Sequence, residues 1–133
     1  MAVLDRSREE RAALAAALAD PERLVVVALC AAWCDTCREF RAAFERIAAA
    51  RAGTTFAWLD IEDDSAVCGD VDVENFPTLA LYRGTAPVHF GVSLPQEGTV
   101  ARLVDALAEG DRILAVPPEA VVALAVALAR GES

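Results

Sequence analysis

The 133-residue chain contains no lysine, one histidine and one tyrosine. Its basic residues are twelve arginines, which 21 acidic residues outnumber, and the formal net charge is −9. Because binding of nucleic-acid phosphates needs clustered basic side chains, we expect no nucleic-acid partner. The longest apolar run covers only residues 120–129. A membrane-spanning helix needs about 20 apolar residues, so we expect no membrane partner either.

The N-terminal stretch lacks the basic segment and uninterrupted apolar run that are typical of a signal peptide. Residues 1–20 instead mix acidic and basic side chains with alanines. We therefore expect a cytoplasmic protein, in which reducing conditions disfavour structural disulfides. Its four cysteines are then expected to be free thiols, metal ligands or a catalytic pair.

Two kinds of hydrophobic pattern alternate along the chain and predict an α/β fold. Ser7 and Glu10 form a capping box that predicts a helix over residues 9–18. The unbroken apolar run 24–29 predicts a strand buried on both faces. The other expected elements are a helix over 35–51, a strand over 55–61, a short helix or loop around Cys68, strands over 78–82 and 88–92, a helix over 99–108 and a last helix between 117 and 131.

The order of these elements predicts a mixed four-stranded sheet flanked by helices. Strands joined by helices should be parallel, and the late hairpin should add antiparallel pairing. We expect one domain over residues 1–110 and a helical extension over 111–133 that packs on it. The last helix is apolar around most of its circumference and therefore needs burial on more than one side. Beyond packing, it either leaves an apolar strip for a homodimer or another partner, or adds a simple layer to a monomer.

Two closely spaced cysteines, Cys34 and Cys37, follow the buried strand and open the next helix. The N-terminus of a helix presents unpaired N–H groups and the positive end of the helix dipole, which favour a thiolate. A thiolate is the species that attacks a disulfide. We interpret Cys34 as the nucleophile and Cys37, one helical turn later, as the thiol that resolves the mixed disulfide.

The segment Trp33-Cys34-Asp35-Thr36-Cys37 resembles the W-C-x-x-C centre of thioredoxins. Two further features resemble that family: the Phe-Pro-Thr segment at 76–78, where the family has a cis-proline, and the glycine that follows the hairpin. The resemblance covers about residues 8–109. It implies a thioredoxin-like three-layer sandwich and protein thiol–disulfide exchange without a cofactor.

The resemblance also implies how substrates are bound. Trp33, Phe76, Pro77 and Gly91 are expected to form the docking surface for protein disulfides, while a thioredoxin reductase or a similar donor supplies electrons. A cis Pro77 would leave nearby backbone groups free to bind an extended substrate chain. The alternative is a thioredoxin-fold binding or chaperone-like module with little turnover.

The sequence departs from the family pattern at several positions. Where thioredoxins carry a buried acid and a neighbouring lysine, this chain has Ala28 and Trp58. Asp35 and Thr36 replace the usual Gly-Pro and are expected to tune the cysteine pair. The Asp35 carboxylate disfavours a Cys34 thiolate, whereas the helix dipole favours it, and the sequence does not decide between them. These departures leave room for a specialised client.

The remaining cysteines raise the question of a metal site. Cys30, Cys34 and Cys37 have the C-x3-C-x2-C spacing of radical SAM iron–sulfur sites, and Cys68 would complete a set of four zinc ligands. The chain is too short for a radical SAM barrel, and nothing predicts that Cys68 approaches the pair. We therefore expect no metal, with Cys30 as a small buried hydrophobe. His89 is expected to lie on an edge strand without a cysteine partner.

Overall fold

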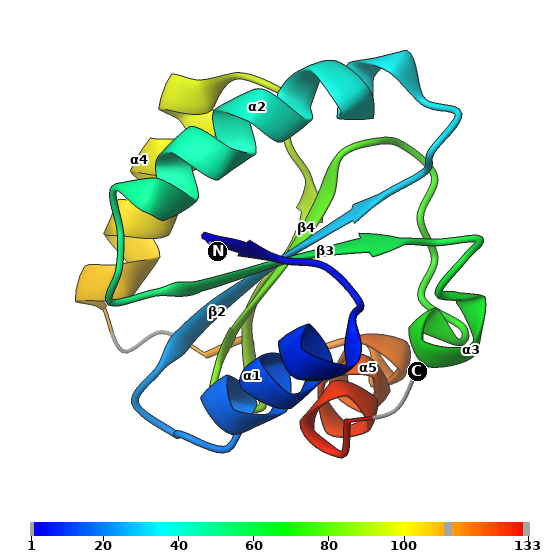
Figure 1. Cartoon of the computed structure of the whole chain (residues 1–133). Coiled ribbons are helices and arrows are strands. Elements are labelled where there is room, and N and C mark those ends of the chain that lie inside the picture. Colours follow the sequence, from blue (N-terminus) through cyan, green and yellow to red (C-terminus); the bar gives the residue numbers. More distant parts are fainter. Residues whose placement is uncertain (1, 111–112, 132–133) are drawn as a thin grey trace.

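A mixed five-stranded sheet forms the centre of the computed structural model, which describes residues 2–110 and 113–131 (Figure 1). The strand order is β1-β3-β2-β4-β5. β3 pairs in parallel with β1 and β2, and β4 pairs antiparallel with β2 and β5. The strands are β1 (Val3–Leu4), β2 (Leu24–Cys30), β3 (Thr55–Asp60), β4 (Thr78–Arg83) and β5 (Ala86–Val92).

The two-residue strand β1 is absent from the sequence-based expectation of four strands. Val3 and Leu4 pair with Phe56 and Ala57 at the edge of the sheet. Two residues are too few to show the alternation that identifies a strand, so only the long-range pairing reveals it. The expected mixed sheet between helices is otherwise confirmed.

Helices cover both faces of the sheet and give three layers (Figure 1). α2 and α4 lie on one face, and α1, α3 and α5 lie on the other. The helices are α1 (Arg8–Leu18), α2 (Asp35–Ala49), α3 (Ser65–Cys68), α4 (Glu97–Glu109) and α5 (Glu119–Ala129). In the described part of the chain, every helix is too short or too polar to cross a membrane.

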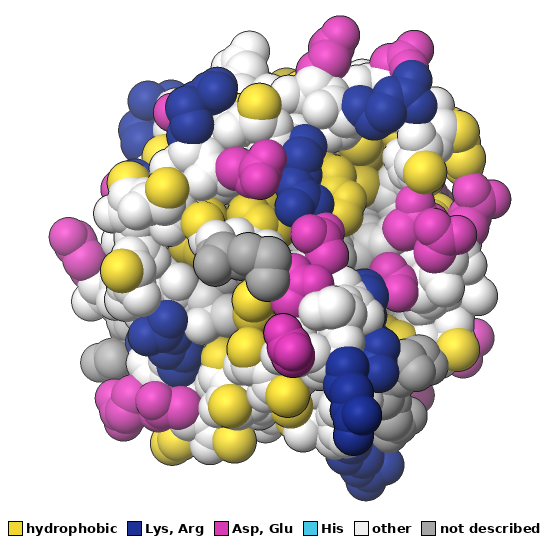
Figure 2. Space-filling model, viewed as in Figure 1, with side chains coloured by type: hydrophobic (Ala, Val, Ile, Leu, Met, Phe, Trp, Pro, Cys, Tyr) yellow, Lys and Arg dark blue, Asp and Glu magenta, His cyan; other side chains and the backbone are white. Residues whose placement is uncertain are grey.

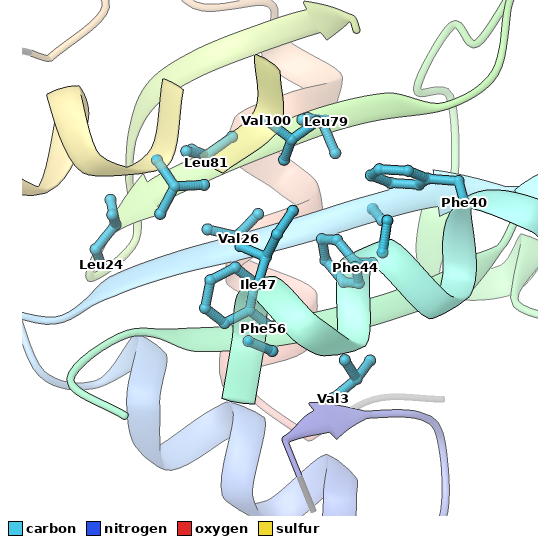
Figure 3. Close-up of a cluster of buried hydrophobic side chains, with 14 of the residues drawn as sticks. Val3, Leu24, Val26, Phe40, Phe44, Ile47, Phe56, Leu79, Leu81 and Val100 are labelled. Carbon is cyan, nitrogen blue, oxygen red and sulfur yellow. The ribbon is translucent and has the colours of Figure 1, made fainter. Parts of the chain in front are cut away.

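The central strand β2 is fully buried because its two faces serve two hydrophobic cores. Leu24, Val26 and Ala28 face α2 and α4, whereas the intervening residues of β2 face α1 and α5. Figure 3 shows Phe40, Phe44 and Ile47 of α2 packed over the first of these faces. Full burial of one such large side chain contributes about 1.5–3 kcal/mol. This packing fixes the start of α2 near the end of β2.

The N-terminus of α1 has the expected capping box. The Ser7 hydroxyl accepts the Glu10 N–H at 3.2 Å, and the Glu10 carboxylate accepts the Ser7 N–H at 3.2 Å. The same carboxylate accepts the Asp5 N–H, and this hydrogen bond is the main reason that the pKa of Glu10 is lowered. These contacts attach the segment that carries β1 to the start of α1.

The C-terminal helix α5 packs beside α1 on the sheet. Its buried side chains join the core that contains Leu14 and Leu18 of α1. The buried Tyr82 hydroxyl of β4 donates a hydrogen bond to the Val121 carbonyl at 2.9 Å and attaches α5 to the sheet. Val122 and Val126 remain 36% and 37% exposed, which leaves a narrow apolar strip on the outer side of α5.

Charged side chains of both signs are interspersed on the outer surface. On the face shown in Figure 2, arginines alternate with aspartates and glutamates, and apolar atoms lie between them. Several of these charges form ion pairs, among them Arg41 with Asp5 and Arg51 with Asp105, each at 2.8 Å. The carboxylates of these two pairs are about half exposed, so solvent screens the pairs and they stabilise the fold only weakly.

Candidate active site

The cysteine pair lies at the N-terminus of α2. Cys34 is the N-cap of this helix, and its Sγ accepts the Cys37 N–H at 3.4 Å. The Cys34 N–H donates in turn to the Ala31 carbonyl at 3.0 Å. The Cys34 side chain is half-buried, whereas Cys37 is only 1% exposed. Cys34 is therefore the more accessible of the two thiols.

The surroundings of Cys37 favour its protonated form at rest. Burial is the main reason that the pKa of Cys37 is raised, and the neighbouring Cys34 raises it further. Hydrogen bonds with the Cys30 thiol and the Ala31 backbone act in the opposite direction. Cys37 must therefore be activated before it can attack as a thiolate.

Asp35 and Thr36 are exposed between the two cysteines. The Asp35 carboxylate forms an ion pair with the Arg38 guanidinium, which also donates to the Ala32 carbonyl at 2.6 Å. The Asp35 and Arg38 side chains are 82% and 60% exposed, so solvent screens their interaction. The negative charge beside Cys34 thus has a cationic partner one helical turn away, which the sequence analysis did not identify.

Asp60, at the end of β3, holds the loop that precedes the cysteines. Its Oδ2 accepts the Ala32 N–H at 2.6 Å, and its Oδ1 accepts the N–H groups of Glu62 and Asp63 at 2.8 and 3.0 Å. Asp60 was not among the site residues expected from the sequence. The position of Asp60 at the end of a predicted strand could have indicated it. The strands β2 and β3 are parallel, so Cys30 and Asp60 at their carboxyl ends lie side by side.

Trp33 and Phe76 form an aromatic surface beside Cys34. Their rings meet edge to face with centroids 5.4 Å apart, and Trp33 is 62% exposed. The Phe76–Pro77 peptide bond is cis, and Pro77 is buried. The structure therefore brings two of the four residues of the expected docking surface, Trp33 and Phe76, into contact next to Cys34, and Pro77 directly follows Phe76 in the chain.

The fourth residue, Gly91, lies on β5 opposite Leu79. It lines a shallow hollow of about 180 Å³ together with Thr78 and Phe90. A Cβ atom added at Gly91 would meet only His89 Nε2, at 3.9 Å, so the local packing does not require glycine. Its expected contact with substrate stays a prediction.

Ala28 on β2 and Trp58 on β3 are direct partners in the register of these two parallel strands. Ala28 is fully buried in the core under α2. Trp58 packs against Phe44 with ring centroids 5.6 Å apart, and the Arg41 guanidinium lies 5.1 Å from its ring. Neither position carries a group that takes up or releases a proton, so these residues act in packing.

The other two cysteines lie in different environments. Cys30 ends β2 and is 1% exposed, and burial raises its pKa far above its usual range. Cys68 is buried at the end of α3 on the opposite face of the sheet, and burial raises its pKa to about 11. Among residues 2–110 and 113–131, no three His, Cys, Asp or Glu side chains are arranged to hold a metal ion. His89 lies on β5, where burial lowers its pKa.

A family model described as Thioredoxin matches residues 7–105. The chain belongs to the thioredoxin family. It is 35% identical to Thioredoxin-2 of Saccharomyces cerevisiae over 68 residues, which cover 51% of this chain and 65% of the yeast protein. It is 32% identical to the thioredoxin of Alicyclobacillus acidocaldarius over 88 residues, which cover 65% of this chain and 84% of that protein.

Solved structures of thioredoxins share the fold. The thioredoxin of Trypanosoma brucei brucei aligns with a TM-score of 0.65 at 21% identity, covering 81% of this chain and 92% of that chain. The thioredoxin of Fasciola hepatica aligns with a TM-score of 0.64 at 22% identity, covering 80% and 98%. Two of the sequence alignments cover less of the relative than these structural alignments do: this chain spans 65% of the yeast thioredoxin and 48% of Thioredoxin H2-2 from rice.

Proposed function

We propose that this protein is a thiol–disulfide oxidoreductase that reduces disulfides in other proteins through Cys34 and Cys37. Membership of the thioredoxin family supports a role in thiol–disulfide exchange in general. The observation that carries the specific proposal is the pairing of a half-buried Cys34 at the helix N-cap with a buried Cys37, whose N–H lies 3.4 Å from the Cys34 sulfur.

The first step is attack of the Cys34 thiolate on a substrate disulfide. The Cys34–substrate S–S bond forms, the substrate S–S bond breaks, and one substrate thiolate leaves. The N–H of Cys37 and the dipole of α2 stabilise negative charge on the Cys34 sulfur before the attack. A thiolate leaving group then takes a proton from water.

The second step returns the substrate. The Cys37 thiolate attacks the Cys34 sulfur, the Cys34–Cys37 disulfide forms, and the second substrate thiolate leaves. Two electrons have then passed from the protein to the substrate.

We propose that a thioredoxin reductase or a similar electron donor reduces the Cys34–Cys37 disulfide again. We further propose a cytoplasmic location, where thiols are kept reduced.

We assign substrate docking to the aromatic surface formed by Trp33 and Phe76. An extended chain around the substrate disulfide would lie against Trp33 and Phe76, beside the cis Pro77. Aromatic side chains bury a large apolar area and suit partners of varied sequence. Protein disulfides are therefore the proposed substrate class.

Reduction of insulin in the presence of dithiothreitol tests this function, because the freed insulin chains precipitate and can be followed by turbidity. The wild-type chain should accelerate precipitation, whereas Cys34→Ser should match the rate of dithiothreitol alone. Cys68→Ser is the matched control, since Cys68 lies on the opposite face of the sheet and should leave the rate unchanged.

The alternative is a binding module with little turnover, and the absence of a proton-handling group at Ala28 and Trp58 favours it. A wild-type chain that binds a disulfide-containing protein but leaves insulin precipitation at the rate of dithiothreitol alone would support the binding module and contradict the oxidoreductase.

A further inference from the structure

The loop between β2 and α2, residues 31–34, carries Cys34 and is held at Ala32 from two sides. The Ala32 N–H donates to Asp60 Oδ2 at 2.6 Å, and the Ala32 carbonyl accepts a hydrogen bond from Arg38 Nη1 at 2.6 Å. The Cys34 N–H is bound within the same loop, to the Ala31 carbonyl at 3.0 Å. Asp60 belongs to β3 and Arg38 to the start of α2, so two separate elements fix the residue that lies two positions before the proposed nucleophile.

The Arg38 guanidinium has a second partner on the other side of Cys34 in the chain. Its Nη2 atom forms an ion pair with the carboxylate of Asp35, the residue that directly follows Cys34. The guanidinium fork can serve two acceptors at once because its N–H donors point in fixed, separate directions. A carboxylate beside a cysteine disfavours the thiolate, and a nearby cation offsets this effect. One side chain thus holds the loop before Cys34 and balances the charge after it.

We propose that Arg38 is a positioning residue for the attack by Cys34. Its guanidinium holds the Ala32 carbonyl and pairs with the Asp35 carboxylate, so that the sulfur keeps its place at the start of α2 without an unbalanced negative charge beside it. The inference rests on the proposed function, because attack by the Cys34 thiolate is the first step of that reaction. Arg38 takes no part in the transfer of electrons or protons.

Solvent exposure sets the size of the expected effect. The side chains of Arg38 and Asp35 are 60% and 82% exposed, so water screens the charge between them. In water, two unit charges a few ångströms apart interact with an energy of the order of the thermal energy. Loss of the guanidinium should therefore change rates at Cys34 by a small factor and leave the fold intact.

Alkylation of Cys34 measures its reactivity without any substrate protein. The rates with neutral iodoacetamide and anionic iodoacetate are compared at one pH in low salt, and tandem mass spectrometry assigns the label to Cys34. Arg38→Gln should lower the ratio of the iodoacetate rate to the iodoacetamide rate about threefold, because the unpaired Asp35 carboxylate repels the anionic reagent. Asp35→Asn in the same chain should restore the ratio, and about 1 M salt should abolish the difference by screening.

The hold on the loop is measured separately, by hydrogen exchange of the Cys34 amide in NMR spectra. Arg38→Gln should speed this exchange about fivefold, the usual net effect of one hydrogen bond, because the Ala32 carbonyl loses its donor. Arg46→Gln is the matched control: Arg46 also lies on α2, is 64% exposed and forms an ion pair with Glu97. This control makes the same change in net charge and should alter neither quantity.

Arg38→Lys keeps the positive charge and should hold the alkylation ratio close to that of the parent. The proposal is wrong if Arg38→Gln slows both reagents equally, or if its Cys34 amide exchanges at the parental rate. A ratio that Asp35→Asn does not restore, or a lysine variant that behaves like glutamine, would also overturn it. No turnover is measured, so inactivity in the insulin assay would contradict the proposed function and leave these results as they are.

Discussion

The indole of Trp33 meets the ring of Phe76 edge to face, with centroids 5.4 Å apart, across a gap of more than forty residues in the sequence. Trp33 directly precedes Cys34, and Phe76 directly precedes the cis Pro77. The contact thus joins the cysteine loop to the loop before β4. It creates an apolar surface beside Cys34, where the proposed substrate proteins would approach.

Trp33→Ala and Phe76→Ala should each weaken docking of protein disulfides. We expect kcat/KM for insulin to fall about tenfold, or roughly 1.4 kcal/mol, as the aromatic contact area is lost. Reduction of a small disulfide such as dithiobis(nitrobenzoate) should change little, because it needs no extended docking surface. Equal losses for both substrates would show that these rings support the cysteine loop and do not bind substrate.

Asp60→Ala should loosen the loop before the cysteines. The carboxylate accepts backbone N–H groups from Ala32, Glu62 and Asp63, and these donors would lose their partner. We expect the free energy of unfolding in urea to fall by about 1–3 kcal/mol and exchange to slow. Glu62→Ala, an exposed acid on the segment that follows Asp60, is the control for a change of charge alone. Unchanged stability in Asp60→Ala would contradict the role assigned to these hydrogen bonds.

Resolution of the mixed disulfide should accelerate with pH. The pKa of Cys37 is raised mainly by burial, so its thiolate is scarce near neutral pH, and each pH unit below that pKa should raise the rate about tenfold. Ala28→Asp should flatten this profile by adding a base under the cysteine pair. It should also destabilise the fold by about 1–3 kcal/mol, because it places a polar group in the core.

Stopped-flow release of a mixed disulfide between pH 6 and 9 measures both profiles. Adding Trp58→Lys to Ala28→Asp should recover part of the lost stability, since it supplies an opposite charge at the paired position. Identical pH profiles for the parent and Ala28→Asp would mean that another group already handles the proton of Cys37.

A chain that ends at Gly110 should be less stable than the full chain. It lacks α5, exposes Leu14 and Leu18 of α1, and leaves the Tyr82 hydroxyl without the Val121 carbonyl. Urea denaturation should show a lower midpoint and a smaller slope, since less apolar surface is buried. Unchanged stability would contradict the packing role of α5.

Pairing of two chains through the exposed strip of α5 stays a prediction. Val122 and Val126 are the side chains that form this strip, and Val126→Arg would place a charge within it. Light scattering should give a dimer for the full chain and a monomer for Val126→Arg if the strip is an interface. A monomeric full chain would identify α5 as a simple added layer.

Much of the fold follows from local patterns in the sequence. The capping box at Ser7, the fully apolar β2 and the amphipathic α2 each depend on neighbouring residues, and the structure has all three. The expected sheet lacked β1, because Val3 and Leu4 form a strand only through pairing with β3. The apolar circumference of α5 indicated burial on several sides, but not that it would lie beside α1.

The site was predictable where a motif marks it. Trp33, Cys34 and Cys37 are adjacent in the chain, and their positions follow from the start of one helix. Asp60 belongs to the same site, but its hydrogen bond with the Ala32 N–H depends on two parallel strands, β2 and β3, ending at one edge of the sheet.

In the proposed reaction, Cys34 attacks the substrate disulfide and Cys37 resolves the mixed disulfide. Cys37→Ser should trap the mixed disulfide, because serine cannot displace the bound substrate. After mixing with a disulfide-containing protein, intact-mass spectrometry should show one covalent adduct per chain, and peptide mapping should assign it to Cys34. The double variant Cys34→Ser/Cys37→Ser should show none. An adduct on Cys30 or Cys68, or no adduct with Cys37→Ser, would contradict the account.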